Sequence, residues 1–132
     1  ETVKEINQRL VLQLMGTNCM RNRFHSDIYV LKKKKHMIEN PHINYVIPDV
    51  RFENEMKMIR SLNGFVWNVR RGNLPEWWSD AVLDNTTGSN FMEKHNIHDS
   101  EWKWILPNNE FDQIIYNDSD LNSLEQQIEQ NI

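Results

Sequence analysis

A short apolar run that ends in charged residues constrains the fold of this chain more than any other feature. Tyr45, Val46 and Ile47 are aromatic or β-branched, which is typical of a buried strand. Asp49 and Arg51 follow, and a helical pattern begins directly after them. In open α/β sheets, ligands bind outside the carboxyl ends of the strands, where a carboxylate suits a metal ion and a guanidinium suits a phosphate. A buried Asp–Arg pair that caps the next helix explains the same spacing equally well.

Helical and strand patterns alternate along the rest of the chain. Apolar residues at three- and four-residue spacing predict helices over 3–14 (ended by Gly16), 27–39 (ended by Asn40-Pro41), 53–62, 90–95 and 121–128. Strand patterns cover residues 45–47, 65–69 and 112–116. Residues 70–88 have no sustained period, and we expect residues 70–95 to form a lid-like loop region. This order predicts a single α/β domain over 1–132, with a parallel sheet of about three strands and four to five flanking helices.

Composition narrows the class of protein. A formal charge of −4 and a pI near 5.7 argue against a general nucleic-acid or anionic-membrane binder. Cys19 is the only cysteine, which fits a reducing compartment such as the cytoplasm, and no apolar run approaches the ~20 residues of a membrane span. The sequence opens at Glu1 inside a helical pattern. We therefore expect a preceding strand and a longer parent protein.

Four stretches in order carry a family resemblance. They are residues 12–18 with Arg21, residues 46–55, residues 98–102 and residues 112–124. Together they resemble the deoxynucleoside monophosphate kinases of phages and large viruses, a branch of the P-loop kinases. Asn18 departs from the acid usual in that family, and Asp120 follows Ser119 where a Gly-Ser or Gly-Thr pair is usual. The resemblance implies a P-loop-kinase-like fold and transfer of a phosphoryl group from ATP to a deoxynucleoside monophosphate, with Mg²⁺.

The resemblance also implies roles for the catalytic candidates. Asp49 would hold Mg²⁺ through water or orient the acceptor phosphate, and Arg51 would clamp a phosphate. Arg70 and Arg71 would close over the transferring group, although arginines on loops are commonly only solvated.

Substrate contacts are implied for residues from two further stretches. The residues expected to contact the phosphate, sugar or base of the substrate are Thr17, Arg21, Arg23, His98, Ser100 and Glu101. For the segment 98–101, a helix-start cap explains the residue types equally well.

One element of such a kinase is absent from these 132 residues. No glycine opens the phosphate-loop pattern Gly-x-x-x-x-Gly-Lys-Ser/Thr, which cradles the phosphates of ATP. The chain is therefore expected to be the C-terminal part of a kinase or, alternatively, a non-catalytic nucleotide-binding or structural virion relative. The expected partners are ATP and the monophosphate in a host cytoplasm or virus factory, and a homodimer is compatible with the sequence.

Several conspicuous residues have simpler interpretations. Lys32–Lys35 lies mid-helix, as expected of a solvated face, and the five histidines lack the spacing of a zinc site. Nucleic-acid binding through these lysines and the tryptophans is the weakest of the function classes. The tryptophans of 77–78 and 102–104 suit either core packing or stacking on a base.

Overall fold

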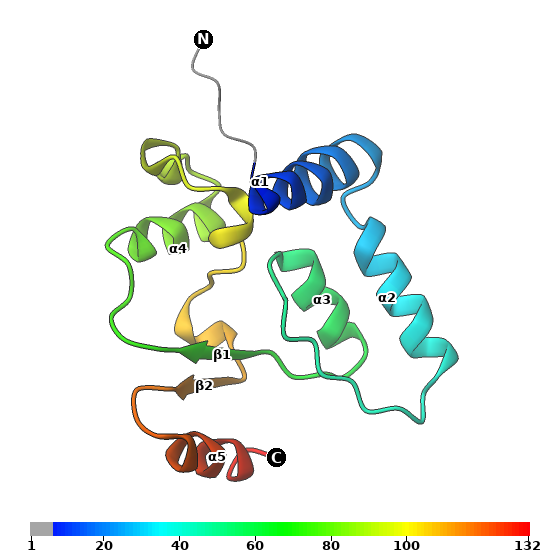
Figure 1. Cartoon of the computed structure of the whole chain (residues 1–132), viewed down its shortest axis with the longest axis vertical. Helices are drawn as coiled ribbons and strands as arrows, with labels where there is room; N and C mark the ends of the chain where they lie inside the picture. The colour runs from blue at the N-terminus through cyan, green and yellow to red at the C-terminus, as the bar shows by residue number, and fades with distance from the viewer. Residues whose placement is uncertain (1–6) are drawn as a thin grey trace. The chain divides into compact units, whose positions relative to one another are not determined.

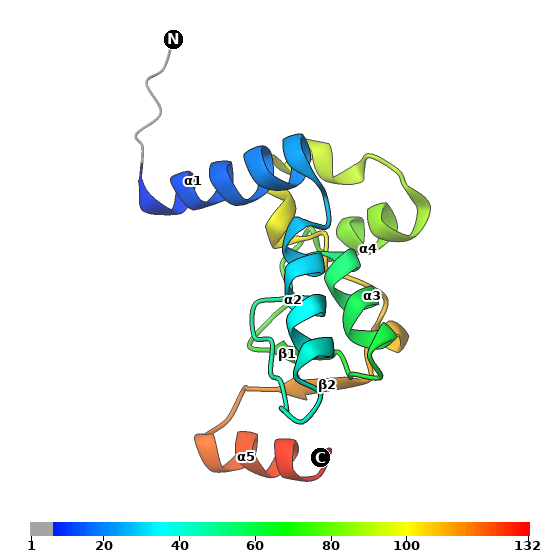
Figure 2. The same ribbon diagram turned by 90° about the vertical axis from the view of Figure 1, so that its right-hand side faces the viewer.

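In the computed structural model, which describes residues 7–132, the chain divides into two units at Val50–Arg51. The N-terminal unit is helical, with α1 (Gln8–Gln13), the π-helix η1 (Leu14–Phe24) and α2 (Ile28–Glu39). Figures 1 and 2 show α1 and η1 as one continuous helical rod, from which α2 turns away. Within residues 7–50 only Thr17 and Val30 are buried, so this unit has almost no core of its own.

The predicted helix end at Gly16 is wrong. Gly16 lies inside η1, and the helical rod continues to Phe24 before His25 becomes extended. A glycine inside a helix costs only about 1 kcal/mol relative to alanine, so it does not by itself end the helix. The earlier part of the predicted helix, residues 3–6, lies outside the described residues.

The predicted boundaries of α2 are confirmed. Asp27 is the N-cap residue, and its backbone N–H donates to Nδ1 of His25 at 3.0 Å. At the other end, the side-chain amide of Asn40 donates to the carbonyl oxygen of His36 at 2.8 Å. Pro41 then prevents continuation, because the residue before a proline avoids helical geometry.

The predicted strand over 45–47 is wrong. This segment is irregular in the structure, and the side chain of Val46 is 91% exposed. A strand requires a neighbour with which to share its backbone hydrogen bonds. In the described part of the chain the sheet consists of two other strands, so a favourable local sequence has no partner here.

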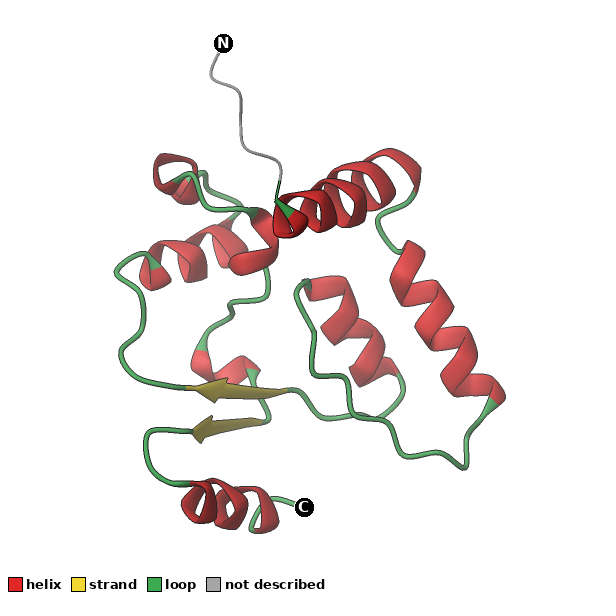
Figure 3. Ribbon diagram, in the orientation of Figure 1, coloured by secondary structure: helices red, strands yellow, loops and turns green. Residues whose placement is uncertain are grey.

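The C-terminal unit contains the sheet and the remaining helices (Figure 3). Its elements are α3 (Glu53–Ser61), β1 (Trp67–Arg70), α4 (Trp78–Thr87), η2 (Phe91–His95), η3 (Asp99–Glu101), η4 (Asn108–Glu110), β2 (Gln113–Tyr116) and α5 (Leu121–Glu129). The two strands are parallel and in register from Trp67↔Gln113 to Arg70↔Tyr116. The α/β class is therefore confirmed, with two strands among the described residues instead of three. None of the described helices is long and apolar enough to cross a membrane.

The loop predicted over 70–88 is wrong where α4 forms. Trp78, Ala81 and Val82 lie at helical spacing, but the polar Asp84 and Asn85 interrupt the apolar pattern by which such a helix is recognised. Both polar side chains bond to backbone groups instead of facing water. The role of residues 70–95 as a lid stays a prediction.

The hydrophobic core of this unit lies around α4. Ala81, Met92 and Ile105 are buried at its centre. Partly buried side chains surround them: Trp77, Trp78, Val82, Ile97, Trp102 and Trp104. The packing interpretation of the tryptophans is therefore confirmed, and the rings of Trp78 and Trp104 meet edge to face at 5.6 Å.

The outer edge of β2 is covered by a side chain of α5. The N–H of Tyr116 donates to Oε1 of Gln127 at 3.0 Å, and Nε2 of Gln127 donates to the carbonyl oxygen of Tyr116 at 2.9 Å. Figure 2 shows α5 lying next to this strand. The side-chain amide of Gln127 thus satisfies both the N–H and the carbonyl oxygen of Tyr116, which point away from β1.

The first prediction concerns the tight turn that ends α3. Asn63, with φ at 59°, makes the left-handed turn, and the N–H of Gly64 donates to the carbonyl oxygen of Ile59 at 3.0 Å. A Cβ on Gly64 would lie 2.7 Å from Cγ2 of Ile59 and 3.1 Å from its carbonyl oxygen. We expect Gly64→Ala to lower the free energy of unfolding by about 1–3 kcal/mol, measured by urea denaturation.

Asn63→Gly is the matched control for this prediction. Glycine adopts positive φ more readily than asparagine, so this variant should be as stable as the parent or slightly more stable. Equal stability of Gly64→Ala and the parent would mean that Ile59 moves aside at no cost.

Candidate functional site

The carboxyl ends of β1 and β2 are fastened to each other. The carbonyl oxygen of Arg70 accepts from the N–H of Asn117 at 2.7 Å. Two residues on, the N–H of Gly72 donates to Oδ1 of Asp118 at 2.6 Å, with Gly72 at a φ of +67°. Two hydrogen bonds therefore connect the two strands at the edge where parallel sheets bind ligands. The last residue of β1 at this edge is Arg70, which is buried.

Strand alternation turns Arg70 inward. Asn68 and Arg70 are 3% and 8% exposed, whereas Val69 between them is 60% exposed, because successive side chains of a strand point to opposite faces. Nη2 of Arg70 donates to Oδ1 of Asn108 at 2.6 Å, and its guanidinium lies 5.2 Å from the ring centre of Trp78.

Among the residues that the structure describes, this buried cation has no anionic partner. Within residues 7–132 no carboxylate pairs with Arg70, and its Nε has no hydrogen-bond acceptor. Burying an uncompensated charge costs several kcal/mol, which a neutral hydrogen bond and a cation–π contact offset only in part. An oxyanion would supply what is missing, so Arg70 is the strongest ligand-binding candidate. Its neighbour Arg71 is exposed.

The structure also brings Arg51 to the segment 98–101. Nη1 of Arg51 lies 3.7 Å from Oε2 of Glu101, with side chains 50% and 32% exposed. Nδ1 of His98 lies 2.9 Å from Oγ of Ser100 and accepts from its backbone N–H at 3.2 Å. The segment therefore does contain a helix-start cap, but His98 is the N-cap of η3 instead of the expected Asp99 or Ser100. The guanidinium of Arg51 is already paired, which distinguishes it from that of Arg70.

Neither Asp49 nor Arg51 caps α3 with its side chain. Oε2 of the buried Glu55 accepts from the backbone N–H groups of Arg51 and Phe52, at 2.7 and 3.1 Å. Sequence reasoning missed this residue. A glutamate at the third position of the helix, which reaches back to the N-terminal backbone, was the available signal.

The candidates of the N-terminal unit lie in two places: Thr17, Arg21 and Arg23 belong to η1, and Asp49 follows α2. Asp49 accepts from Nζ of Lys33 at 3.1 Å and is exposed. Thr17 is buried within η1, and Arg23 is exposed. Arg21 donates to the carbonyl oxygen of Ser26 at 3.3 Å and lies over the ring of Tyr29 at 5.1 Å.

No preformed metal cage exists in the described part of the chain. Nowhere between residues 7 and 132 do three histidine, cysteine or acidic side chains come together. Asp49 still offers carboxylate oxygens, and Mg²⁺ is commonly held by one or two carboxylates together with substrate phosphates.

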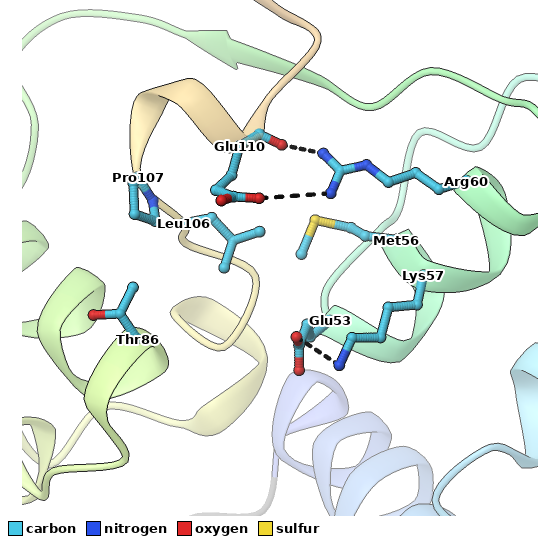
Figure 4. A pocket seen from close by; sticks show the side chains of 8 residues that line it. All are labelled: Glu53, Met56, Lys57, Arg60, Thr86, Leu106, Pro107 and Glu110. Atoms are coloured by element: carbon cyan, nitrogen blue, oxygen red, sulfur yellow. Dashed lines mark hydrogen bonds and ion pairs between the residues drawn. The ribbon is translucent and has the colours of Figure 1, made fainter.

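A cleft of about 290 Å³ lies beside α3 (Figure 4). Its lining residues are Glu53, Met56, Lys57, Arg60, Thr86, Leu106, Pro107 and Glu110. Nζ of Lys57 lies 2.7 Å from Oε1 of Glu53, and Arg60 donates to the carbonyl oxygen of Glu110 and faces its carboxylate. Because each cation in the lining already faces a carboxylate, this cleft is a weaker anion site than Arg70.

A charged cluster fastens η2 to α4. Oδ2 of Asp80 lies 2.8 Å from both Nζ of Lys94 and Nε2 of His95. The hydrogen bond from Lys94, followed by that from His95, lowers the pKa of Asp80. The ion cluster therefore favours the charged carboxylate in the folded chain.

This lowered pKa gives a prediction for acid conditions. A carboxyl whose pKa falls on folding adds stability above its ordinary pKa of about 3.9, and that stability is lost as the pH falls through the lower folded pKa. We expect the parent to lose more stability between pH 5 and pH 3 than Asp80→Asn does, measured by thermal unfolding at each pH. Parallel curves for the two proteins would contradict this role of Asp80.

Comparison with known proteins gives one informative likeness. No protein-family model matches the chain, and no solved structure matches it. The chain is 34% identical over 74 residues to a protein of Acanthamoeba polyphaga mimivirus named "Putative deoxynucleotide monophosphate kinase". The match covers 48% of this chain and 38% of that relative, so the chain spans well under half the length of the relative. The likeness supports a relationship to the nucleotide kinases.

Proposed function

We propose that this chain contributes the monophosphate-binding part of a deoxynucleoside monophosphate kinase, which converts ATP and the monophosphate to ADP and the diphosphate. The observation that carries the proposal is the buried, unpaired guanidinium of Arg70 at the carboxyl end of a parallel strand. The likeness to the mimivirus protein supports the nucleotide as the class of ligand.

In this proposal the arginines act by charge. Phosphoryl transfer needs positioning and neutralisation of negative charge more than covalent chemistry from the protein. Arg70 would bind phosphate oxygens, and the exposed Arg71 would approach the transferring group. Arg51 would exchange its contact with Glu101 for the acceptor phosphate. His98 and Ser100 would then position the sugar or base. Thr17, Arg21 and Arg23, which belong to the N-terminal unit, would be further contacts of the monophosphate.

Mg²⁺ would enter with ATP and neutralise its phosphates. Asp49 is the residue that would hold the ion, directly or through water, and Lys33 would then release one carboxylate oxygen. These 132 residues contain no phosphate-loop pattern for ATP itself. The alternative function is that of a nucleotide-binding relative without catalysis, which needs no such loop.

Two measurements test the proposal and separate it from the alternative. Calorimetry on the 132-residue chain should show binding of a deoxynucleoside monophosphate and little binding of ATP. A coupled assay of the full-length natural protein, with ATP, Mg²⁺ and each deoxynucleoside monophosphate, should show diphosphate production. Monophosphate binding without turnover would favour the non-catalytic relative, and absence of any nucleotide binding would overturn both functions.

A further inference from the structure

The buried face of β1 holds more unsatisfied donors than Arg70 alone. Among the described residues, Nδ2 of Asn68, Nε of Arg70 and Nε1 of Trp104 are closed to water and have no hydrogen-bond acceptor. Each of these groups is a donor. A buried donor without an acceptor costs about 1–3 kcal/mol, so native structures contain few of them, and each calls for an explanation.

Two of these donors lie on one side of the sheet, and the third is close to them through Trp78. Asn68 and Arg70 are alternate residues of β1 and share its inward face. The ring of Trp78 lies 5.2 Å from the guanidinium of Arg70 and 5.6 Å from the ring of Trp104. Trp78 therefore contacts both the guanidinium of Arg70 and the indole ring of Trp104.

The shared chemistry of the donors identifies the kind of ligand. They comprise an amide N–H, a guanidinium N–H and an indole N–H, with one full positive charge and no carboxylate paired with it within residues 7–132. A group that only accepts hydrogen bonds and carries negative charge matches all of them. A phosphate monoester has three such oxygens.

The geometry points to a phosphate site on the inward face of β1, in which Asn68 and Trp104 bind the same phosphate as Arg70. The inference rests on the proposed function in taking that phosphate to belong to a nucleotide. Trp78 covers the guanidinium of Arg70 in this structure, so the phosphate displaces the ring and replaces a cation–π contact with charge-assisted hydrogen bonds.

A comparison of two asparagines tests whether the donors are unsatisfied. Asn68→Leu removes a buried amide without a partner, so its melting temperature should equal or exceed that of the parent. Asn85→Leu is the matched control, because Nδ2 of Asn85 donates to the carbonyl oxygens of Trp102 and Ile105 at 3.0 and 2.7 Å. That variant should melt roughly 5 °C or more below the parent. A comparable loss in Asn68→Leu would show that its amide has a partner and would overturn the inference.

Binding tests whether the donors serve a ligand. Calorimetry with a deoxynucleoside monophosphate should show affinity roughly tenfold or more weaker for Asn68→Leu than for the parent. Trp104→Phe keeps the aromatic ring and removes the N–H, so it should also weaken binding. Unchanged affinity in both variants would overturn the inference.

Nuclear magnetic resonance of the parent chain observes the donors directly. The Nε–H signal of Arg70 and the indole N–H signal of Trp104, assigned with Arg70→Met and Trp104→Phe, should move downfield when inorganic phosphate or the monophosphate is added. The deoxynucleoside without phosphate should leave them in place. Movement with the deoxynucleoside alone, or none with either phosphate, would overturn the inference. Movement with phosphate in a full-length protein that transfers no phosphoryl group would leave the inference standing and refute only the proposed kinase activity.

Discussion

Replacing Arg70 by methionine is expected to weaken binding of a deoxynucleoside monophosphate by roughly 10- to 100-fold. A hydrogen bond to a charged group contributes about 1.5–3 kcal/mol, and each 1.4 kcal/mol is a factor of ten in affinity. Methionine fills much of the same volume against Trp78 without the charge. Because the guanidinium is buried without a carboxylate among residues 7–132, the variant should melt at or above the temperature of the parent.

Arg60→Met is the control for the loss of one positive charge. Arg60 pairs with Glu110 beside the cleft at α3, at the other end of η4 from Asn108, the hydrogen-bond partner of Arg70. Its removal should leave the affinity within about twofold, since exposed ion pairs contribute little. An equal loss of affinity in Arg60→Met and Arg70→Met would show that net charge alone governs binding. A marked loss of stability in Arg70→Met would show that the arginine is a structural element instead.

The largest loss of stability is expected from Asp84→Ala. The side chain of Asp84 is 7% exposed, and its two oxygens accept from the backbone N–H groups of Phe91 and Met92, at 2.6 and 2.8 Å. The substitution leaves two donors without an acceptor, at about 1–3 kcal/mol each. We expect the free energy of unfolding to fall by about 2–5 kcal/mol in urea denaturation. The amide protons of Phe91 and Met92 should exchange faster.

Two other variants serve as comparisons for the loss of stability in Asp84→Ala. Asp84→Asn retains one acceptor oxygen, so its loss should be roughly half as large. Asp118→Ala removes the same side chain from an exposed position, where among the described residues it accepts from Gly72 alone, and should cost less than about 1 kcal/mol. If Asp84→Ala and Asp118→Ala cost the same, the buried carboxylate does not hold η2 against α4.

The parts of the fold that local chemistry specifies could be predicted from the sequence. The positions of Asp27 and Asn40-Pro41 bound α2, although the side chain of Asp27 makes no capping hydrogen bond; the effect of Pro41 depends on neighbouring residues alone. The strands near 65–69 and 112–116 were recognised by their apolar residues, and the structure places β1 and β2 there. Tyr45-Val46-Ile47 has the same local character, yet it is not a strand, because pairing depends on a partner that a local pattern does not reveal.

The candidate site was predictable in its residue types but not in its contacts. Arg51 and Arg70 were selected for their places after strand patterns, and only the structure separates the paired guanidinium of the former from the unpaired one of the latter. Asn68 was missed, although a polar residue at an inward position of a strand is a signal in the sequence. For Trp104 the sequence predicts either packing with a hydrogen-bonded indole or stacking on a base; the packing is observed, but its indole N–H has no acceptor among the described residues.

The glutamine of α5 that bonds to Tyr116 has a consequence for how the sheet can grow. Since the N–H of Asn117 points to β1, the backbone of Tyr116 points outward, and the amide of Gln127 occupies it as a neighbouring strand would. An approaching chain would have to break both hydrogen bonds before it could add to β2. The molecule thus discourages the addition of a further strand on this side with a single side chain.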